Sequence, residues 1–471
     1  MSRIFKNIII LLILALFLNI ELTAQNAIIN KLPFNSSAKN DFAPFVVDST
    51  IYFSSDRKNE LLKSYLDQNN NWLHRIYQVQ IVSKNNFSKP ILFSATEDYK
   101  LNTGSIWISP GEKRAFVTQN QAPKTNKKKQ QKNLLGIFSI DKSYGSNWQT
   151  PTPFPYNSLN EHSTAHPTFS SDGKTMFFVS NQNDSYGESD IYQSDFENGQ
   201  WSEPINLGSN INTSGKEIFP YYHPSGKLYF SSNGRSESND FDIFVSTFEN
   251  NEWGKAKALE EPINSKYNDF SCFIFESELE GYFASNREGV DNIYHFRIPF
   301  PSFPNAQEEV EDIFCFTLFE NGPYQSDTLP YKYKWLFNDG ITKMGTEVDH
   351  CFPGEGEYSV NLSVYDTLQK VDLFTVATYD LPLENTQQIK IECSDTVKVN
   401  EPMNISAKNS ELKGFIPEDY YWILDHNKKT KGITINHIFR KSGTYTIVCG
   451  APSIHNPQHK LATKKTIIVI E

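Results

Sequence analysis

The chain has 471 residues, with 55 acidic and 44 basic side chains and a formal net charge of −11. This length is enough for two to four domains. The acidic residues form no long block, and the negative balance argues against nucleic-acid binding, which favours basic surfaces. After the N-terminal segment no stretch approaches the roughly 20 apolar residues that a membrane-spanning helix needs, so we expect no transmembrane anchor.

Residues 1–24 have the pattern of a secretory signal peptide. Arg3 and Lys6 precede the apolar run IIILLILALFL, which is followed by ELTAQ. This pattern predicts cleavage after Ala24 and a mature chain that begins at Gln25. No cysteine follows the apolar run directly, so lipidation at that point is not expected. We therefore predict an exported protein that is periplasmic, associated with the outer membrane, or secreted.

An internal repeat dominates residues 25–298. The clear copies are HPTFSSDGKTMFFVSNQ from residue 166, FPYYHPSGKLYFSSNGR from residue 219 and FSCFIFESELEGYFASNRE from residue 270, and divergent copies begin at residues 42 and 104. Each copy predicts a strand, a tight turn and a second strand, and the clear copies continue into a third strand. Asp190 and Asp242, just before two third strands, are 52 residues apart. Four short strands per period of about 50 residues are typical of a β-propeller blade.

The two ends of this repeat region complement each other. The last copy stops after its third strand, whereas residues 26–35 resemble fourth-strand segments such as EPINLGSNIN. We expect residues 26–35 to complete the last blade and close the ring, which leaves no unpaired radial edge. Five strand sets predict five blades. Six blades remain the alternative, because the first two periods are longer.

Residues 167–192 resemble the TolB-like (PD40-type) propeller repeat, in which P-x-F-S-x-D-G-K-x-x-x-F-x-S-N is followed by D-I-Y. The resemblance covers roughly residues 26–298 and implies a β-propeller of the kind found in Gram-negative, Bacteroidetes-type envelope proteins. Repeats of this type often accompany OmpA-like domains in outer-membrane, type IX secretion or gliding components. The resemblance therefore implies an accessory role in such machinery. This chain lacks the OmpA-like domain, so direct binding to the cell wall is not implied.

After a Pro-rich linker, residues 299–312, two related segments follow at 313–385 and 386–471. Five residues of the first segment recur in the second at a constant offset of 87 residues, and alternating strands predict an immunoglobulin-like β-sandwich for each. The recurring pairs are Trp335 and Trp422, His350 and His437, Phe352 and Phe439, Gly356 and Gly443, and Tyr358 and Tyr445.

The tryptophans are expected in the cores, the histidines are expected to lock turns by hydrogen bonds, and Tyr358 and Tyr445 are expected to lead a strand. With WLFNDG and HCFPGEGEY, the first segment resembles the PKD domain. The second segment is PKD-like, because it has lost the Asp-Gly turn. The chain is thus predicted to be all-β.

The five cysteines follow the same division. Cys315 and Cys351 fall in the first sandwich, and Cys393 and Cys449 fall in the second. An exported chain meets oxidising conditions, so we predict one disulfide in each sandwich and a free thiol at Cys272.

Candidate sites for chemistry are few. Asp172 and Gly173 are expected to form a tight hairpin turn. Asp190 and Asp242 stand in oxygen-rich loops, where capping of the strand turn is the preferred interpretation and Ca²⁺ binding is the alternative. Three acidic residues stand just before predicted first strands, and they are expected either to be solvated or to ring one mouth of the channel and bind a cationic group: Asp41, Glu217 and Asp269.

We find no nucleophile elbow, zinc-protease motif or phosphate-binding loop, so no catalytic residues are assigned. The sequence favours a non-enzymatic interaction or scaffold protein of the bacterial cell envelope, with envelope or outer-membrane proteins as partners. The alternative is a polysaccharide-active enzyme or a glycan-binding adhesin that uses the propeller mouth.

Overall fold

The computed structural model of the protein describes residues 27–58, 72–93, 101–121, 134–142, 148–235, 238–323 and 329–471. The predicted signal peptide lies outside these ranges. Within them the chain is built from strands, and the 3-10 turn η1 (Asp425–Asn427) is the only helical element. No helix of the described part is long and apolar enough to cross a membrane. The chain divides into two compact units, with a boundary between Pro301 and Ser302.

The described part of residues 28–297 forms five antiparallel sheets. The first contains β2 (Asp41–Val47), β3 (Thr50–Ser55), β4 (Arg75–Ser83), β5 (Asn86–Phe87) and β6 (Ile91–Leu92), and the second contains β7 (Thr103–Ile108), β8 (Arg114–Asn120), β9 (Leu135–Asp141) and β10 (Thr152–Pro153). The third contains β11 (Thr164–Phe169), β12 (Thr175–Ser180), β13 (Asp190–Glu197), β14 (Gln200–Trp201) and β15 (Ile205–Asn206). The fourth contains β16 (Glu217–Tyr222), β17 (Lys227–Ser232), β18 (Asp242–Glu249), β19 (Glu252–Trp253) and β20 (Lys257–Ala258). The fifth contains β21 (Asp269–Ile274), β22 (Glu280–Ser285), β23 (Asn292–Arg297) and β1 (Ile28–Lys31).

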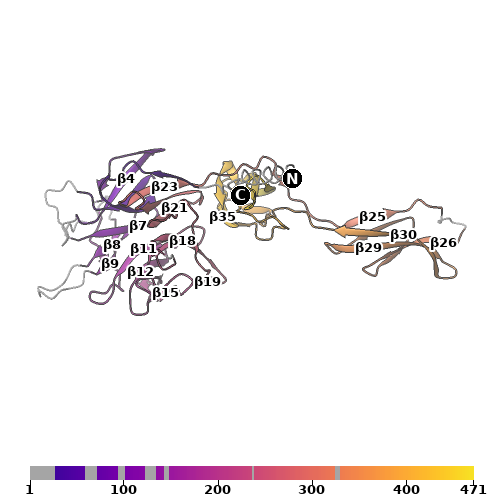
Figure 1. The fold of residues 1–471 in the computed structure, drawn as a ribbon, viewed down its shortest axis with the longest axis horizontal. Coiled ribbons are helices and arrows are strands. Elements are labelled where there is room, and N and C mark those ends of the chain that lie inside the picture. The colour runs from indigo at the N-terminus through magenta and orange to yellow at the C-terminus, as the bar shows by residue number, and fades with distance from the viewer. Residues whose placement is uncertain are drawn as a thin grey trace, which may run out of the picture. The chain divides into compact units, whose positions relative to one another are not determined.

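These sheets follow one another around a closed ring of contacts, which is a β-propeller arrangement. Figure 1 labels strands of all five sheets, among them β4, β7, β11, β18 and β23. The first strand of each sheet contacts the first strands of its two neighbours, in the order β2, β7, β11, β16, β21 and back to β2. β1 pairs antiparallel with β23, with Ile28 opposite Arg297 and Lys31 opposite Tyr294. The expected closure of the ring by the N-terminal segment is therefore confirmed.

The hydrophobic core of the ring lies between its sheets. Each junction between consecutive sheets holds one cluster of buried apolar side chains, as where Phe177 of the third sheet stacks on Tyr222 of the fourth. Because both faces of each inner strand are covered, the second strands are nearly continuous runs of buried residues, such as TIYFSS in β3. This burial explains the Phe-rich and Tyr-rich second strands of the repeat.

A repeated asparagine clamps the fourth-strand segment onto the third strand. Its side chain accepts a hydrogen bond from the N–H of one isoleucine and donates one to the carbonyl of the same isoleucine, at 2.7–3.0 Å. Residues 26–35 resemble fourth strands because Asn35 makes these bonds in the fifth sheet. The clamped pairs are Asn35 with Ile293, Asn157 with Ile137, Asn212 with Ile191, and Asn264 with Ile243.

A second repeated contact occurs in all five sheets. A side-chain oxygen at the end of the second strand accepts a hydrogen bond from the backbone N–H just before the first strand, at 2.7–3.1 Å. This contact accounts for the final Asn of the S-N motif and is also present in the two divergent copies. The accepting residues are Asp56, Asn120, Asn181, Asn233 and Asn286.

The first sandwich pairs a four-stranded sheet, in the order β27-β26-β29-β30, with the two-stranded sheet β25-β28. Trp335 is buried, and its Nε1–H donates to the Gly345 carbonyl at 2.9 Å. His350 stacks on Phe337, and its Nε2 lies 2.9 Å from Asp339 Oδ2, in the Asn-Asp-Gly turn. This contact ties the turn to the core. The strands are β25 (Cys315–Phe319), β26 (Tyr331–Phe337), β27 (Thr342–Met344), β28 (Glu347–Cys351), β29 (Gly356–Asp366) and β30 (Val371–Leu383).

The second sandwich repeats these features. Trp422 Nε1–H donates to the Gly432 carbonyl at 2.7 Å, and His437 Nε2 lies 2.7 Å from Asp425 Oδ1. The His–Asp contact is thus kept although the Asp-Gly turn is lost. β24 (Gln307–Glu308), within the predicted linker, pairs parallel with the last strand of this sandwich. The other strands are β31 (Thr396–Lys398), β32 (Pro402–Ser406), β33 (Tyr421–Ile423), β34 (Lys429–Lys431), β35 (Thr434–Ile438), β36 (Gly443–Pro452) and β37 (Lys460–Ile470).

Only one of the two predicted disulfides is present. Cys315 and Cys351 are bonded across β25 and β28, where they are directly opposite. The predicted bridge between Cys393 and Cys449 is wrong, because both are free. At the offset of 87 residues, Pro402 and Ile438 occupy the bridged positions, and they face each other in the same register. Cys393 and Cys449 therefore are not counterparts of the bridged pair. Cys272 is free and buried.

Candidate functional site

The three acidic residues at the starts of first strands lie inside the ring junctions. Asp41, Glu217 and Asp269 are each 0% exposed. An arginine just after the second strand of the same sheet pairs with each, at 2.6 Å for Arg57, 3.2 Å for Arg235 and 2.6 Å for Arg287. A buried carboxylate needs such partners.

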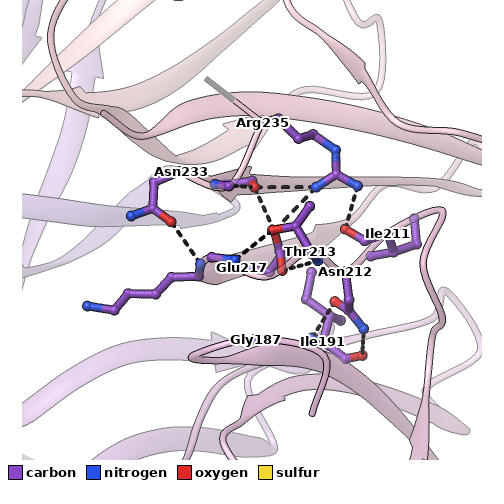
Figure 2. Close-up of polar contacts among 12 residues, drawn as sticks. Gly187, Ile191, Ile211, Asn212, Thr213, Glu217, Asn233 and Arg235 are labelled. Atoms are coloured by element: carbon purple, nitrogen blue, oxygen red, sulfur yellow. Dashed lines mark hydrogen bonds and ion pairs between the residues drawn. The ribbon is translucent and has the colours of Figure 1, made fainter. Parts of the chain in front are cut away.

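In the example of Glu217, hydrogen bonds and an ion pair engage both oxygens of the buried carboxylate (Figure 2). It accepts hydrogen bonds from the Thr213 N–H at 2.8 Å, from Thr213 Oγ1 at 2.7 Å and from Ser232 Oγ at 2.6 Å. Arg235, besides its ion pair with Glu217, donates to the Ile211 carbonyl at 2.8 Å. Burial raises the pKa of Glu217 and lowers the pKa of Arg235.

Each cluster therefore ties the end of one repeat to the start of the next. Both interpretations of these carboxylates from the sequence are wrong. They are not solvated strand ends, because they are fully buried, and they do not bind a cationic group at a channel mouth, because burial makes them inaccessible and arginine already neutralises them.

The other predicted turn residues also serve the fold. Asp172 Oδ1 accepts hydrogen bonds from Ser170 Oγ at 2.6 Å and from the Lys174 N–H at 3.1 Å, and Gly173 has a φ of +69°, which glycine tolerates at no cost. The Ser170 hydroxyl, through its hydrogen bond, lowers the pKa of Asp172.

Asp190 and Asp242 begin third strands. Asp190 accepts hydrogen bonds from the Tyr186 N–H at 2.6 Å, the Gly187 N–H at 3.2 Å and Asn206 Nδ2 at 2.7 Å, which is the geometry of a capped turn. Burial raises the pKa of Asp242 to about 6, and nearby Asp269 adds to this shift. Within the described ranges no group of three or more His, Cys, Asp or Glu side chains is placed to hold a metal ion.

A ring of aromatic side chains, which the sequence analysis missed, lies toward the other ends of the first strands. The fifth residue of the first strand is aromatic in four of the five sheets: Phe45, Trp107, Tyr221 and Phe273. We call these four residues the aromatic collar. Ring centroids are 6.4 Å apart for Phe45 and Trp107, 5.7 Å for Phe45 and Phe273, and 5.0 Å for Tyr221 and Phe273.

The third sheet has no aromatic residue at the fifth position of its first strand. Thr168 of β11 occupies it and is buried, but the next residue, Phe169, lies 4.2 Å from Trp107 between ring centroids. The Tyr221 hydroxyl donates to the Ile274 carbonyl at 2.9 Å, so its polar end is bonded within the ring. The collar thus presents apolar, half-buried surface.

A cavity of about 770 Å³ opens over the collar and is lined by all four of its residues. The first hairpin turns surround it, with Asp48, Lys113 and Asp172 among its lining residues and the Arg114–Asp141 ion pair at its edge. Ligand sites in proteins commonly have volumes of roughly 300–1,000 Å³ and combine apolar walls with a few polar groups. This cavity is the candidate binding site of the ring.

The repeat contains a sequence feature that marks the collar, although the sequence analysis did not use it. The recurring pairs Pro44-Phe45, Ile106-Trp107 and Pro220-Tyr221 align at one strand position, four residues after the carboxylate position. Because side chains four positions apart on a strand lie about 13 Å from each other, the carboxylates and the collar occupy opposite ends of the first strands.

Comparison with known proteins identifies one module. Residues 304–376 match the family model described as the PKD domain. This match covers most of the first sandwich, up to the middle of β30, and the segment before it.

Solved structures with similar arrangements include enzymes of several kinds. A puromycin-hydrolysing peptidase of Mycobacterium tuberculosis has 12% identity and a TM-score of 0.30, over 88% of this chain and 58% of the peptidase. A family 117 glycoside hydrolase of Zobellia galactanivorans has 10% identity and a TM-score of 0.37, over 58% of this chain and 90% of the hydrolase. A protein of unknown function from Dyadobacter fermentans has 12% identity and a TM-score of 0.36, over 57% and 78%. The chain covers little more than half of the peptidase, and similarities at these scores carry no argument about activity.

Proposed function

We propose that this chain is an exported, non-enzymatic interaction protein of the bacterial cell envelope, whose propeller cavity binds a partner protein. The observation that carries the proposal is the PKD domain at residues 304–376, a module typical of extracellular interaction proteins. The Cys315–Cys351 disulfide fits an oxidising compartment.

The aromatic collar supplies the binding surface in this proposal. Aromatic side chains are enriched where protein partners bind, because each buries a large apolar area at low entropic cost. The charged residues at the cavity edge, Asp48 and Lys113, would give orientation and specificity. The resemblance of the repeat to TolB-like propellers supports an accessory role beside outer-membrane, type IX secretion or gliding components, in the periplasm or at the outer membrane.

A second candidate function is glycan binding or cleavage at the same cavity. The collar favours it, because sugar rings stack on aromatic faces, and Ser109 and Ser170 add hydroxyls to the lining. The buried carboxylates at the opposite ends of the first strands take no part in this candidate.

The test is in-cell crosslinking of the tagged exported chain, followed by mass spectrometry of captured envelope components. Trp107→Ala removes part of the collar, and Lys113→Glu alters the cavity edge at a solvent-facing position without disturbing the collar. Lys257→Glu in β20, exposed and outside the cavity, is the matched control.

We expect wild-type protein and the Lys257→Glu control to capture the same outer-membrane or secretion protein, and both cavity variants to lose it. Unchanged capture by both cavity variants would contradict the proposal. Displacement of the partner by soluble envelope oligosaccharides, or recovery of glycan without protein, would favour the second candidate.

A further inference from the structure

One edge of the first sandwich is open where the second sandwich is covered. In the second sandwich, β37 pairs on one side with β36 and is also paired, in parallel, with β24 and β31. Its counterpart in the first sandwich is β30, which begins after the turn at Lys370. Among the strands that the structure describes, β30 pairs with β29 alone.

This open edge is long and apolar. β30 has 13 residues, and it adds only Leu381 and Leu383, both partly buried, to the sandwich core. Natural proteins usually protect such an edge with short strands, prolines or charges, because it offers unpaired backbone groups to another strand. Here Pro382 limits the edge at its C-terminal end, and the strand has two bulges against β29, at Leu373 and Val376. One bulge lies on each side of Thr375, and the stretch from Val371 to Leu381 pairs with no second strand among the described residues. Five large apolar side chains of that stretch are 38–46% exposed: Val371, Leu373, Phe374, Val376 and Tyr379.

The charges along the edge favour pairing with an identical edge. Lys370 and Asp380 are exposed at the two ends of the stretch, whereas Asp372 is bonded to Lys334 at 2.7 Å. When two copies of the stretch run antiparallel with Thr375 on a two-fold axis, Lys370 of each copy lies opposite Asp380 of the other. The same register sets Val371 opposite Tyr379, and it sets no two like charges opposite each other.

We propose that β30 is a self-association edge through which two copies of this chain form a dimer. Antiparallel pairing of residues 370–380 joins the four-stranded sheets of two first sandwiches into one continuous sheet. At about 3.4 Å per residue this contact is roughly 37 Å long, which makes it a substantial interface when the apolar side chains beside the edge also pack.

The test is analytical ultracentrifugation of the full exported chain at several concentrations and at low salt. Wild-type protein is expected to show a concentration-dependent dimer. Lys370→Glu places Glu opposite Asp380, and Asp380→Lys places Lys opposite Lys370, so each single variant should weaken the dimer by about tenfold or more.

An equimolar mixture of the two single variants should dimerise again, because each repulsive pair becomes attractive in the mixed dimer. The double variant Lys370→Glu, Asp380→Lys should also dimerise. Both positions are exposed, and unchanged circular dichroism melts would show that the variants fold. A monomeric wild-type chain, or a dimer that neither single variant weakens, would overturn the proposal. A dimer weakened by both single variants but not restored in the mixture would overturn the proposed register.

Discussion

At the scale of single residues, the buried carboxylate–arginine pairs are the most demanding contacts of the ring. Asp269 is fully buried and accepts hydrogen bonds from Ser265 Oγ at 2.6 Å and from Arg287 Nη2 at 2.6 Å. Arg287 also lies over the rings of Phe283 and Tyr294, at 5.1 Å from each centroid. Removing one partner of a buried pair leaves the other charge without compensation.

We expect Asp269→Asn to lower the free energy of unfolding by about 3 kcal/mol, because Arg287 then stays buried without its counter-charge. Urea unfolding followed by circular dichroism measures this change. Asp48→Asn, at an exposed turn position, is the matched control and should change stability by less than about 0.5 kcal/mol. Equal effects of the two substitutions would show that the pair does not stabilise the junction.

A second residue-scale prediction concerns pH. Burial raises the pKa of Asp291 to about 6, and nearby Asp56 and Asp41 add to the shift. The native state therefore binds this proton more tightly than the unfolded state does, so ionisation of Asp291 costs stability as the pH rises from about 4 to about 6.

Asp291→Asn removes this cost. We expect the variant to gain about 1–2 kcal/mol in the free energy of unfolding at pH 7 and to lose most of this gain near pH 4, where Asp291 is protonated in the native state and about half protonated in the unfolded state. Urea unfolding at pH 4, 5, 6 and 7 provides the measurement. A variant that is less stable than wild type at pH 7 would contradict the assigned environment.

Residue roles were predictable where a motif repeats and where its chemistry is local. The buried Trp335 and the contact of His350 with the Asn-Asp-Gly turn follow from the spacing within the first sandwich. The arginine partners of Asp41, Glu217 and Asp269 could not be predicted from sequence spacing. These carboxylates and their arginines are 16 or 18 positions apart and meet only after two strands have paired.

At the scale of elements, the asparagine clamps hold the fourth-strand segments. Asn264 is buried, bonds to both backbone groups of Ile243 and also donates to the Leu259 carbonyl at 2.8 Å. We expect Asn264→Ala to lower the free energy of unfolding by about 2–3 kcal/mol, because it leaves buried backbone groups without partners. Gln200→Ala, at an exposed position of β14, is the control. Thermal unfolding of both variants tests this, and equal melting temperatures would argue against the clamp.

The disulfide is a second element-scale prediction. Alkylation of the unfolded, unreduced protein should label three thiols, those of Cys272, Cys393 and Cys449, and leave Cys315 and Cys351 unlabelled. The double variant Cys315→Ser, Cys351→Ser should lose about 2–4 kcal/mol from the stability of the first sandwich, because its unfolded state gains freedom. Mass spectrometry decides the thiol count. If only one thiol were labelled, a second disulfide between Cys393 and Cys449 would be present, which would contradict the structure.

The strands were largely predictable because the chain contains two kinds of internal repeat, the propeller repeat and the pair of related sandwiches. Asn35 carries the same clamp as Asn212 and Asn264, so closure of the ring could be inferred from sequence similarity alone. The second disulfide could not be judged in this way. The prediction assigned one pair of cysteines to each sandwich without considering which residues face each other across paired strands. In the second sandwich, Pro402 and Ile438 hold the positions that correspond to Cys315 and Cys351.

At the scale of the whole molecule, the cavity arises only when the sheets converge. The collar residues come from strands that are far apart in the sequence, with 228 positions between Phe45 and Phe273. No local sequence pattern predicts that their rings are in contact. Composition and repeats therefore define the fold class and the two kinds of module. The binding surface depends on which end of the first strands is open.

The measurement that tests the central claim most directly is site-specific photocrosslinking in cells, with benzoylphenylalanine in place of Lys113 at the cavity or in place of Lys257 outside it. We predict that the probe at position 113 forms an adduct with one envelope protein and that the probe at position 257 does not. The same adducts from both positions, or an adduct from position 257 alone, would contradict the assignment of the aromatic cavity as the binding site.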